Sequence, residues 1–255
     1  MQRVVRTITL AILAVVGPVG SASAHIAPSE TENNRYLKIT PAGDRIRLAY
    51  TVFYGEEPGA GFRQQIDTNH DGQVSDAEAQ VFGTARSAEV AAALELTLDG
   101  KTLPVTWQTI AVGMGSSQVS AGSFSIDFVT TVCSSGGGQH TLLVRDRFRI
   151  PNPGETEAKV EDALGITIDH THVGVINDLG NDYKFVGPGG PLLDDGIAVA
   201  FTVTDKAPMQ DASCKAARSG GGGSARGRIV FAAIGGGIGL GIAIVMSRRG
   251  RRKTT

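Results

Sequence analysis

The segment RIRLAYTVFY, residues 45–54, alternates polar and apolar side chains along most of its length. Its apolar alternate positions are Ile46, Leu48, Tyr50 and Val52. An extended chain points successive side chains to opposite faces, so this period of two predicts a β-strand with one buried face. Residues 41–44, PAGD, predict a turn before this strand, and residues 36–40 predict the partner strand of a hairpin.

Shorter segments with the same alternation follow along the chain. They lie at residues 95–107, around a turn at Asp99-Gly100, at 124–128, and within 140–148, 165–169 and 197–204. Seven or so short strands separated by polar turns predict a mainly β domain, and the arrangement we expect is an antiparallel β-sandwich.

Residues 67–78, DTNHDGQVSDAE, match the twelve-position calcium loop of an EF-hand. The predicted Ca²⁺ ligands are Asp67, Asn69, Asp71, Gln73, Ser75 and Glu78. Gln73 is expected to ligate through its backbone carbonyl and Ser75 through a bridging water, whereas Glu78 supplies both carboxylate oxygens. A polar surface turn is the alternative interpretation, but it does not account for a match at every constrained position.

The residues of the loop that do not ligate also fit an EF-hand. Gly72 stands at position six, where the backbone takes a positive φ, and Val74 is expected to pack beneath the loop. Ser75 and Glu78 form a capping-box pattern, which predicts a helix at about residues 76–94. The apolar stripe predicted for that helix consists of Val81, Phe82, Ala85, Ala88 and Ala92.

The sequence contains no second loop of this kind. The helix that enters the loop is expected to be short, at about residues 62–66, because Pro58, Gly59 and Gly61 precede it. The EF-hand is therefore predicted to be a single insertion between early strands. An unpaired loop with a short entering helix favours a site that stabilises the domain over a calcium-dependent switch.

The N-terminus predicts a secretory signal peptide at residues 1–24. Arg3 and Arg6 precede an apolar core, and residues 22–24 form an A-x-A cleavage site. The mature chain is then expected to begin at His25, with one extracytoplasmic β-rich domain over residues 25–215. Residues 216–228 are rich in glycine and serine and predict a flexible linker.

The C-terminal part predicts a membrane anchor. Residues 229–246 are apolar and long enough to cross a bilayer core as one helix. The tail at residues 247–255 is basic, so the positive-inside rule places it in the cytoplasm and the domain in the periplasm or on the cell surface. Two overlapping G-x-x-x-G spacings in the span also allow homodimerisation, although so glycine-rich a segment produces them by chance.

The charge is distributed unevenly along the chain. All 25 acidic residues, but only 16 of the 24 basic residues, lie within residues 25–227, which gives that region a formal net charge of −9. An acidic domain with few aromatic residues does not favour nucleic acid as a partner. The sequence also lacks the motifs of a serine-hydrolase elbow, a zinc protease or a phosphate loop, so no enzymatic activity is predicted. Asp146, between two arginines, is interpreted as a structural ion pair.

Two pairs of residues have more than one interpretation. Cys133 and Cys214 are the only cysteines, and in an exported chain they predict one disulfide. The alternative is that Cys214 belongs to the C-terminal tail. His170 and His172 would lie on one face of a strand, and with His25 they offer an alternative site for a transition metal. Ordinary exposed strand residues are the simpler interpretation of these histidines.

Residues 25–107 resemble the exported N-terminal domain found on some bacterial HupE/UreJ-type and nickel/cobalt-transporter-like membrane proteins. The resemblance rests on an early histidine, N-R-Y at residues 34–36, R-L-A-Y at 47–50, the loop at 67–78 and L-x-L-x-x-D-G at 94–100. Arg145-Asp146 fits a later R-D element. The resemblance implies a calcium-bearing extracytoplasmic module that serves a membrane-protein partner. Those proteins continue into several membrane helices, so transport by this chain, with one predicted span, is not implied.

These observations predict a membrane-anchored extracytoplasmic protein that binds Ca²⁺ structurally and has a role in binding or assembly. The alternative function is a periplasmic module that handles copper, nickel or cobalt beside a membrane transporter.

Overall fold

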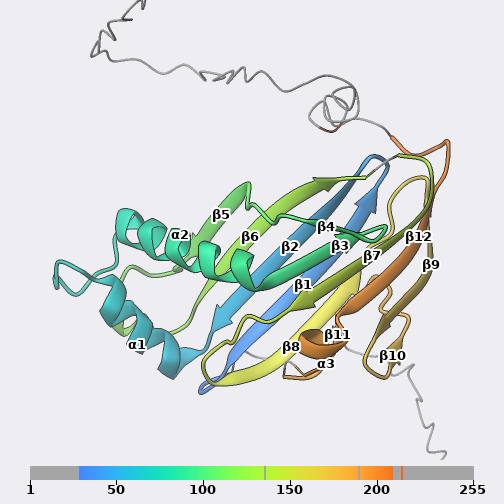
Figure 1. Ribbon diagram of the computed structural model, residues 1–255. Coiled ribbons are helices and arrows are strands. Elements are labelled where there is room, and N and C mark those ends of the chain that lie inside the picture. Colours follow the sequence, from blue (N-terminus) through green and yellow to red (C-terminus); the bar gives the residue numbers. More distant parts are fainter. Residues whose placement is uncertain (1–28, 135, 189, 209–213, 215–255) are drawn as a thin grey trace, which may run out of the picture. The chain divides into compact units, whose positions relative to one another are not determined.

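The computed structural model describes residues 29–134, 136–188, 190–208 and 214, which form two six-stranded sheets (Figure 1). The predicted signal peptide, His25, the predicted linker at 216–228, the predicted span at 229–246 and the basic tail lie outside the described residues. Within the described ranges, no helix combines the length and apolarity needed to span a membrane.

The first sheet contains the strand from which the fold was predicted. Its strand order is β11-β8-β1-β2-β6-β5. The bounds are β1 (Asn33–Ala42), β2 (Arg45–Tyr54), β5 (Thr109–Gly113), β6 (Phe124–Cys133), β8 (Pro153–Val160) and β11 (Lys184–Phe185). The predicted hairpin is confirmed as the β1–β2 pair. All neighbours are antiparallel except β1 and β8, which run parallel, so the prediction of a wholly antiparallel arrangement is wrong at this one pair.

The second sheet is antiparallel throughout and has the order β10-β9-β12-β7-β3-β4. Its strands are β3 (Leu94–Leu98), β4 (Lys101–Leu103), β7 (Gly138–Asp146), β9 (Ile166–Val173), β10 (Ile176–Asn177) and β12 (Ile197–Val203). The hairpin predicted around Asp99-Gly100 is the β3–β4 pair. Both residues have positive φ there, which suits a tight two-residue turn.

The core consists of the apolar alternate residues of both sheets. Ile46, Leu48, Tyr50 and Val52 are all buried, as the period of two predicts. Leu142, Val144, Val199 and Phe201 are their buried counterparts in the second sheet. Removal of this apolar area from water is the main favourable contribution to folding. The mainly β character is therefore confirmed, and the two sheets are consistent with the predicted sandwich.

Two helices are inserted between β2 and β3. They are α1 (Glu56–Ile66) and α2 (Asp76–Ala93), and Figure 1 shows the connection between them projecting away from the sheets. The prediction of an entering helix limited to residues 62–66 is wrong, because α1 begins at Glu56. Pro58 falls in the first turn, where its missing N–H breaks no helical hydrogen bond. A Cβ on Gly59 would lie 2.5 Å from the Gly122 carbonyl oxygen, so glycine permits this close approach.

The face that α2 buries differs from the predicted one. Val81 is 72% exposed, and Ala85, Ala88 and Ala92 are exposed as well. The buried residues of α2 are Ala79, Gly83, Ser87 and Val90. A Cβ on Gly83 would lie 2.6 Å from Val112 Cγ2 of β5, so small residues let this face approach the sheet closely. Of the predicted stripe only Phe82 packs against the core, and its other members face outward, which corrects the prediction.

Two shorter helices complete the described elements. They are α3 (Gly190–Asp194), before β12, and the 3-10 helix η1 (Val119–Ala121), between β5 and β6. Neither of these two shorter helices was predicted from the sequence.

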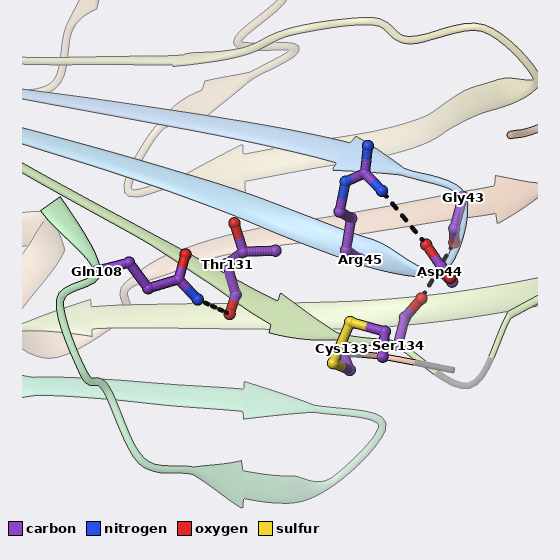
Figure 2. The surroundings of a disulfide bond; sticks show 8 residues. Gly43, Asp44, Arg45, Gln108, Thr131, Cys133 and Ser134 are labelled. Atoms are coloured by element: carbon purple, nitrogen blue, oxygen red, sulfur yellow. Dashed lines mark hydrogen bonds and ion pairs between the residues drawn. A yellow bond between two sulfur atoms is a disulfide. The ribbon is translucent and has the colours of Figure 1, made fainter. Parts of the chain in front are cut away.

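The predicted disulfide joins Cys133, at the end of β6, to Cys214, with a Cα–Cα distance of 5.2 Å (Figure 2). Next to it, Ser134 holds the β1–β2 turn: its N–H donates to the Asp44 carbonyl at 2.9 Å and its hydroxyl donates to the Gly43 carbonyl at 3.1 Å. The alternative in which Cys214 belongs to the tail is thereby excluded. The disulfide fixes the C-terminal end of the described chain to the first sheet.

We expect the Cys133→Ser, Cys214→Ser double variant to lose about 4 kcal/mol in free energy of unfolding, because the disulfide closes a loop with a sequence separation of 81. The measurement is urea unfolding of wild type and variant, with the wild type under dithiothreitol as a second comparison. Equal unfolding midpoints for all three samples would contradict a stabilising disulfide.

Candidate metal centre

The predicted calcium loop lies between α1 and α2, and both helix ends are defined by residues of the loop. Asp67 caps the C-terminus of α1, and its N–H donates to the Arg63 carbonyl at 3.0 Å. Ser75 caps the N-terminus of α2 with the predicted capping box: its side chain accepts from the Glu78 N–H, and the Glu78 side chain accepts from the Ser75 N–H. The predicted calcium loop is therefore flanked by a helix on each side.

Within the loop, short side chains accept hydrogen bonds from the backbone. Asp67 Oδ1 and Oδ2 accept from the N–H groups of Asp71 at 3.2 Å and Gly72 at 2.9 Å. Asn69 Oδ1 accepts from the Asp71 N–H at 2.9 Å, and Asp71 Oδ1 accepts from the Gln73 N–H at 2.9 Å. These bonds curl residues 67–73 around their own side-chain oxygens. Gly72 has the expected positive φ of 80°, which glycine adopts without steric cost.

Glu78 closes the loop from its far end. Its Oε1 accepts from the N–H and the hydroxyl of Thr68, both at 2.8 Å, and its Oε2 accepts from the N–H of Ser75 at 3.0 Å and its hydroxyl at 2.8 Å. The hydrogen bonds from Ser75, followed by those from Thr68, lower the pKa of the Glu78 carboxyl to about 2. The carboxylate at position twelve therefore links the second position of the loop to the first turn of α2.

A segment outside the predicted EF-hand pairs with the loop. The Val74 N–H donates to the Ser117 carbonyl at 2.7 Å, and the Val119 N–H donates to the Gly72 carbonyl at 3.1 Å. Gln73 and Gln118 face each other in this antiparallel bridge. Residues 114–123, which connect β5 to β6, thus pair with the loop through the backbone. We call residues 114–123 the bracing segment.

The bridge sets the direction of the Gln73 carbonyl. Along an extended chain, successive backbone groups point to opposite sides. Because the Gly72 carbonyl and the Val74 N–H both point to the bracing segment, the backbone groups of Gln73 point away from it. The Gln73 N–H accordingly bonds to Asp71, within the loop. We infer that its carbonyl points to the loop side too, which is where the predicted ligand of position seven would be needed.

Arg63, in the last turn of α1, holds the bracing segment in place. Its side chain is fully buried, with 0% exposed, and it donates only to backbone carbonyls of that segment. Nε donates to Gly122 at 2.7 Å, Nη1 to Ser116 at 2.8 Å and Gln118 at 3.1 Å, and Nη2 to Ser123 at 2.9 Å and to Met114. Burial lowers the pKa of the guanidinium, and Glu56 opposes that shift.

The loop carries the oxygen donors that Ca²⁺ prefers, but the carboxylates do not converge in this conformation. Among the described residues, no three histidine, cysteine, aspartate or glutamate side chains are placed so that they could hold one metal ion. The hydrogen bonds of Glu78 explain this, because they direct both of its oxygens to Thr68 and Ser75. The chemical fit rests on the type and order of the oxygen donors, and a metal would require Glu78 to exchange bonds.

The histidines of the alternative site are only partly brought together. His170 and His172 stack on β9, with ring centroids 6.3 Å apart, and His172 Nδ1 lies 3.0 Å from Asn177 Oδ1. His25 lies outside the described residues. His70 is exposed in the loop, as expected for position four.

A buried cluster of three polar side chains, separate from the loop, joins the two sheets. Asp146 Oδ2 of β7 lies 2.6 Å from Arg35 Nη1 of β1 and accepts from the Tyr50 hydroxyl of β2 at 2.8 Å. Burial raises the pKa of the Asp146 carboxyl, and the Arg35 ion pair opposes that shift. The predicted ion pair of Asp146 thus exists, but its partner is Arg35 instead of either neighbouring arginine. The N-R-Y, R-L-A-Y and R-D elements of the sequence meet at this contact.

Comparisons with known proteins add no family assignment. No protein-family model matches the chain. No curated protein matches it either. The site is therefore interpreted from its own residues.

We expect Arg63→Met to lower the free energy of unfolding by about 3 kcal/mol or more, because it leaves buried carbonyls of the bracing segment without donors. The exposed Arg47 of β2 gives a matched control, and Arg47→Met should change the free energy by about 0.5 kcal/mol or less. The measurement is urea unfolding in the presence of chelator. Equal losses in the two variants would contradict the role assigned to Arg63.

A second prediction concerns pH. A carboxyl with a lowered pKa stabilises the fold fully above its ordinary pKa of 4.5, and this stabilisation is lost as pH falls towards about 2. In chelator, the melting temperature of the wild type should therefore fall more steeply between these pH values than that of Glu78→Gln. Glu57→Gln, which removes an exposed charge from α1 but none of the loop's hydrogen bonds, is the control. Parallel curves for wild type and Glu78→Gln would contradict the prediction.

Proposed function

We propose that this chain is an extracytoplasmic calcium-binding protein whose single EF-hand loop stabilises the domain. The observation that carries the proposal is the loop at residues 67–78 together with its surroundings. Residues 67–78 run between two helices, with a positive φ at Gly72, a buried Val74 and a backbone bridge to a second segment. A polar surface turn requires none of these features, and together they favour a calcium loop.

The donors available to the ion are oxygen atoms. Asp67, Asn69 and Asp71 would supply side-chain oxygens, Gln73 its backbone carbonyl, Ser75 a bridging water and Glu78 its carboxylate. Oxygen donors in this number suit a hard cation that takes about 6–8 ligands. Binding would require the Glu78 carboxylate to give up its bonds to Thr68. The ion would then take over the role of joining the two ends of the loop.

A structural role follows from the surroundings of the loop. In paired EF-hands each loop is braced by another loop that also binds calcium. Here the brace is the bracing segment, which Arg63 fixes by five hydrogen bonds to backbone carbonyls. A partner held this firmly does not rearrange easily, so calcium is expected to add stability without a large opening of the helices.

The Cys133–Cys214 disulfide supports a location outside the cytoplasm, because such bonds persist in oxidising compartments. The predicted signal peptide, membrane span and basic tail support the same location from the sequence. We therefore propose a single-pass protein of the cell membrane, with the described domain extracytoplasmic. Its role is in binding or assembly, beside a membrane-protein partner.

The proposal predicts that calcium raises the melting temperature of the protein. If the dissociation constant lies near 10⁻⁴–10⁻³ M, millimolar calcium adds about 1 kcal/mol, which corresponds to roughly 3 °C for a domain of this size. Glu78→Gln should lose most of this shift, because it removes the negative charge and one carboxylate ligand. Gln73→Ala should keep it, because that position ligates through its backbone.

The measurement is a set of melting curves of the purified protein in calcium and in chelator, for wild type and both variants. Magnesium at the same concentration tests selectivity. An unchanged wild-type melting temperature, or an equal shift in wild type and Glu78→Gln, would show that the loop is not a working calcium site.

A further inference from the structure

The edge strands of the two sheets differ in how they are protected from other chains. Among the described strands, β5 and β11 end the first sheet, and β4 and β10 end the second. The free N–H and C=O groups of an edge strand can pair with another chain, and proteins prevent this with very short edge strands or with charged residues on them. β10 has two residues, β11 has two and includes Lys184, and β4 has three and includes Lys101. Three of the four edges are therefore protected.

β5 has neither protection. It consists of five residues, TIAVG at Thr109–Gly113, and among the described strands it pairs only with β6. The sequence around it, residues 102–126, contains no charged residue and no histidine. Thr109, Ala111 and Gly113 are exposed, so solvent reaches the strand. A longer, uncharged and accessible edge is suited to the addition of another strand.

The two faces of β5 have different surroundings. Ile110 and Val112 are half-buried and pack against the core. A Cβ on Gly83 of α2 would lie 2.6 Å from Val112 Cγ2 and 3.3 Å from Ile110 Cγ2, so α2 packs on this face of the strand. A strand added at the free edge would extend the same face, and its apolar side chains would cover the parts of Ile110 and Val112 that are still exposed.

The charge of the domain restricts where two copies of it can meet. Residues 25–227 have a formal net charge of −9, so two copies repel each other across surfaces that carry this charge. The uncharged residues 102–126 form an exception to this rule, and they include the free edge. Two copies can therefore approach each other at β5 without bringing like charges together within the strand pair.

The sequence of β5 also matches itself. When a strand pairs antiparallel with its own copy, the two copies are related by a two-fold axis, which is the commonest symmetry of protein dimers. With the axis at Ala111, this residue faces Ala111 of the second copy. Ile110 then faces Val112 of the second copy, and Thr109 faces Gly113. Cross-strand pairs of β-branched apolar residues such as Ile110 and Val112 stabilise a sheet.

We propose that β5 pairs antiparallel with β5 of a second copy of this chain, about a two-fold axis at Ala111. The two first sheets then form one continuous sheet. The contact is small, so the dissociation constant is expected to lie between about 10⁻⁶ and 10⁻⁴ M. The dimer gives the proposed assembly role a specific contact. It does not require calcium, so its failure would leave the proposed calcium site unaffected.

The direct test is cross-linking of Ala111→Cys in the purified full-length protein. Residues directly opposite each other in an antiparallel pair have Cα atoms about 4.5–5.5 Å apart, which suits a disulfide. The two native cysteines are bonded to each other, so a covalent dimer forms through the new thiol. Thr102→Cys, at an exposed position of β4, is the control. Under mild oxidation, Ala111→Cys should dimerise about 10-fold faster or more, because the pairing raises the effective concentration of its thiols.

A second variant tests the contact without a new bond. Ala111→Glu places two carboxylates opposite each other across the axis and should weaken dimerisation by at least about 10-fold in sedimentation equilibrium. Glutamate is preferred to lysine because Asp127 of β6 lies opposite Ala111 within the sheet and would pair with a lysine. Thr102→Glu adds the same charge to β4 and should leave dimerisation unchanged. Urea unfolding checks that both variants are folded.

Three results would overturn the proposal. The first is a wild-type protein that stays monomeric up to about 10⁻⁴ M. The second is an equal rate of cross-linking in Ala111→Cys and Thr102→Cys. The third is undiminished dimerisation of folded Ala111→Glu, which would place the dimer contact elsewhere, for example in the predicted membrane span.

Discussion

The contact on which the loop region depends is the set of hydrogen bonds from the Arg63 guanidinium to the bracing segment. Five backbone carbonyl contacts from one buried side chain fix residues 114–123 against α1. The bracing segment then pairs with the loop at Gly72 and Val74. Arg63 lies one turn before Asp67, the first residue of the loop. The C-terminal end of α1 therefore leads into the loop and also holds the bracing segment that pairs with it. The predicted calcium loop is thereby paired with a segment that Arg63 holds in place.

The sheets provide the platform for this arrangement and contain a second buried polar contact. Arg35, Asp146 and Tyr50 join β1, β7 and β2 across the core. Removing either charged side chain of this buried ion pair is expected to lower the stability of the domain, because the remaining charge would be buried without a counter-charge. Arg63 donates through all three of its nitrogen atoms, whereas Arg35 Nε is buried without an acceptor among the described residues.

Features with local causes could be predicted from the sequence. The alternation in β2, the capping box at Ser75 and the position of Gly72 each follow from residues close together in the chain, and the structure has all three. The buried face of α2 could not be predicted, because it contains Gly83 and Ser87, which are not hydrophobic, and Gly83 is buried through close approach to β5. The bracing segment and the Arg35–Asp146 pair bring together residues far apart in the sequence, and no local pattern marks either contact.

The central claim is that calcium binding at residues 67–78 is coupled to the bracing segment. Hydrogen–deuterium exchange of the full-length protein, with and without calcium, tests it directly. The account predicts that calcium slows exchange at the Val74 and Val119 amides together, because these two amides form the bridge between loop and brace. Unchanged exchange at both amides, in calcium concentrations up to several times 10⁻³ M, the weak end of extracellular sites, would contradict it.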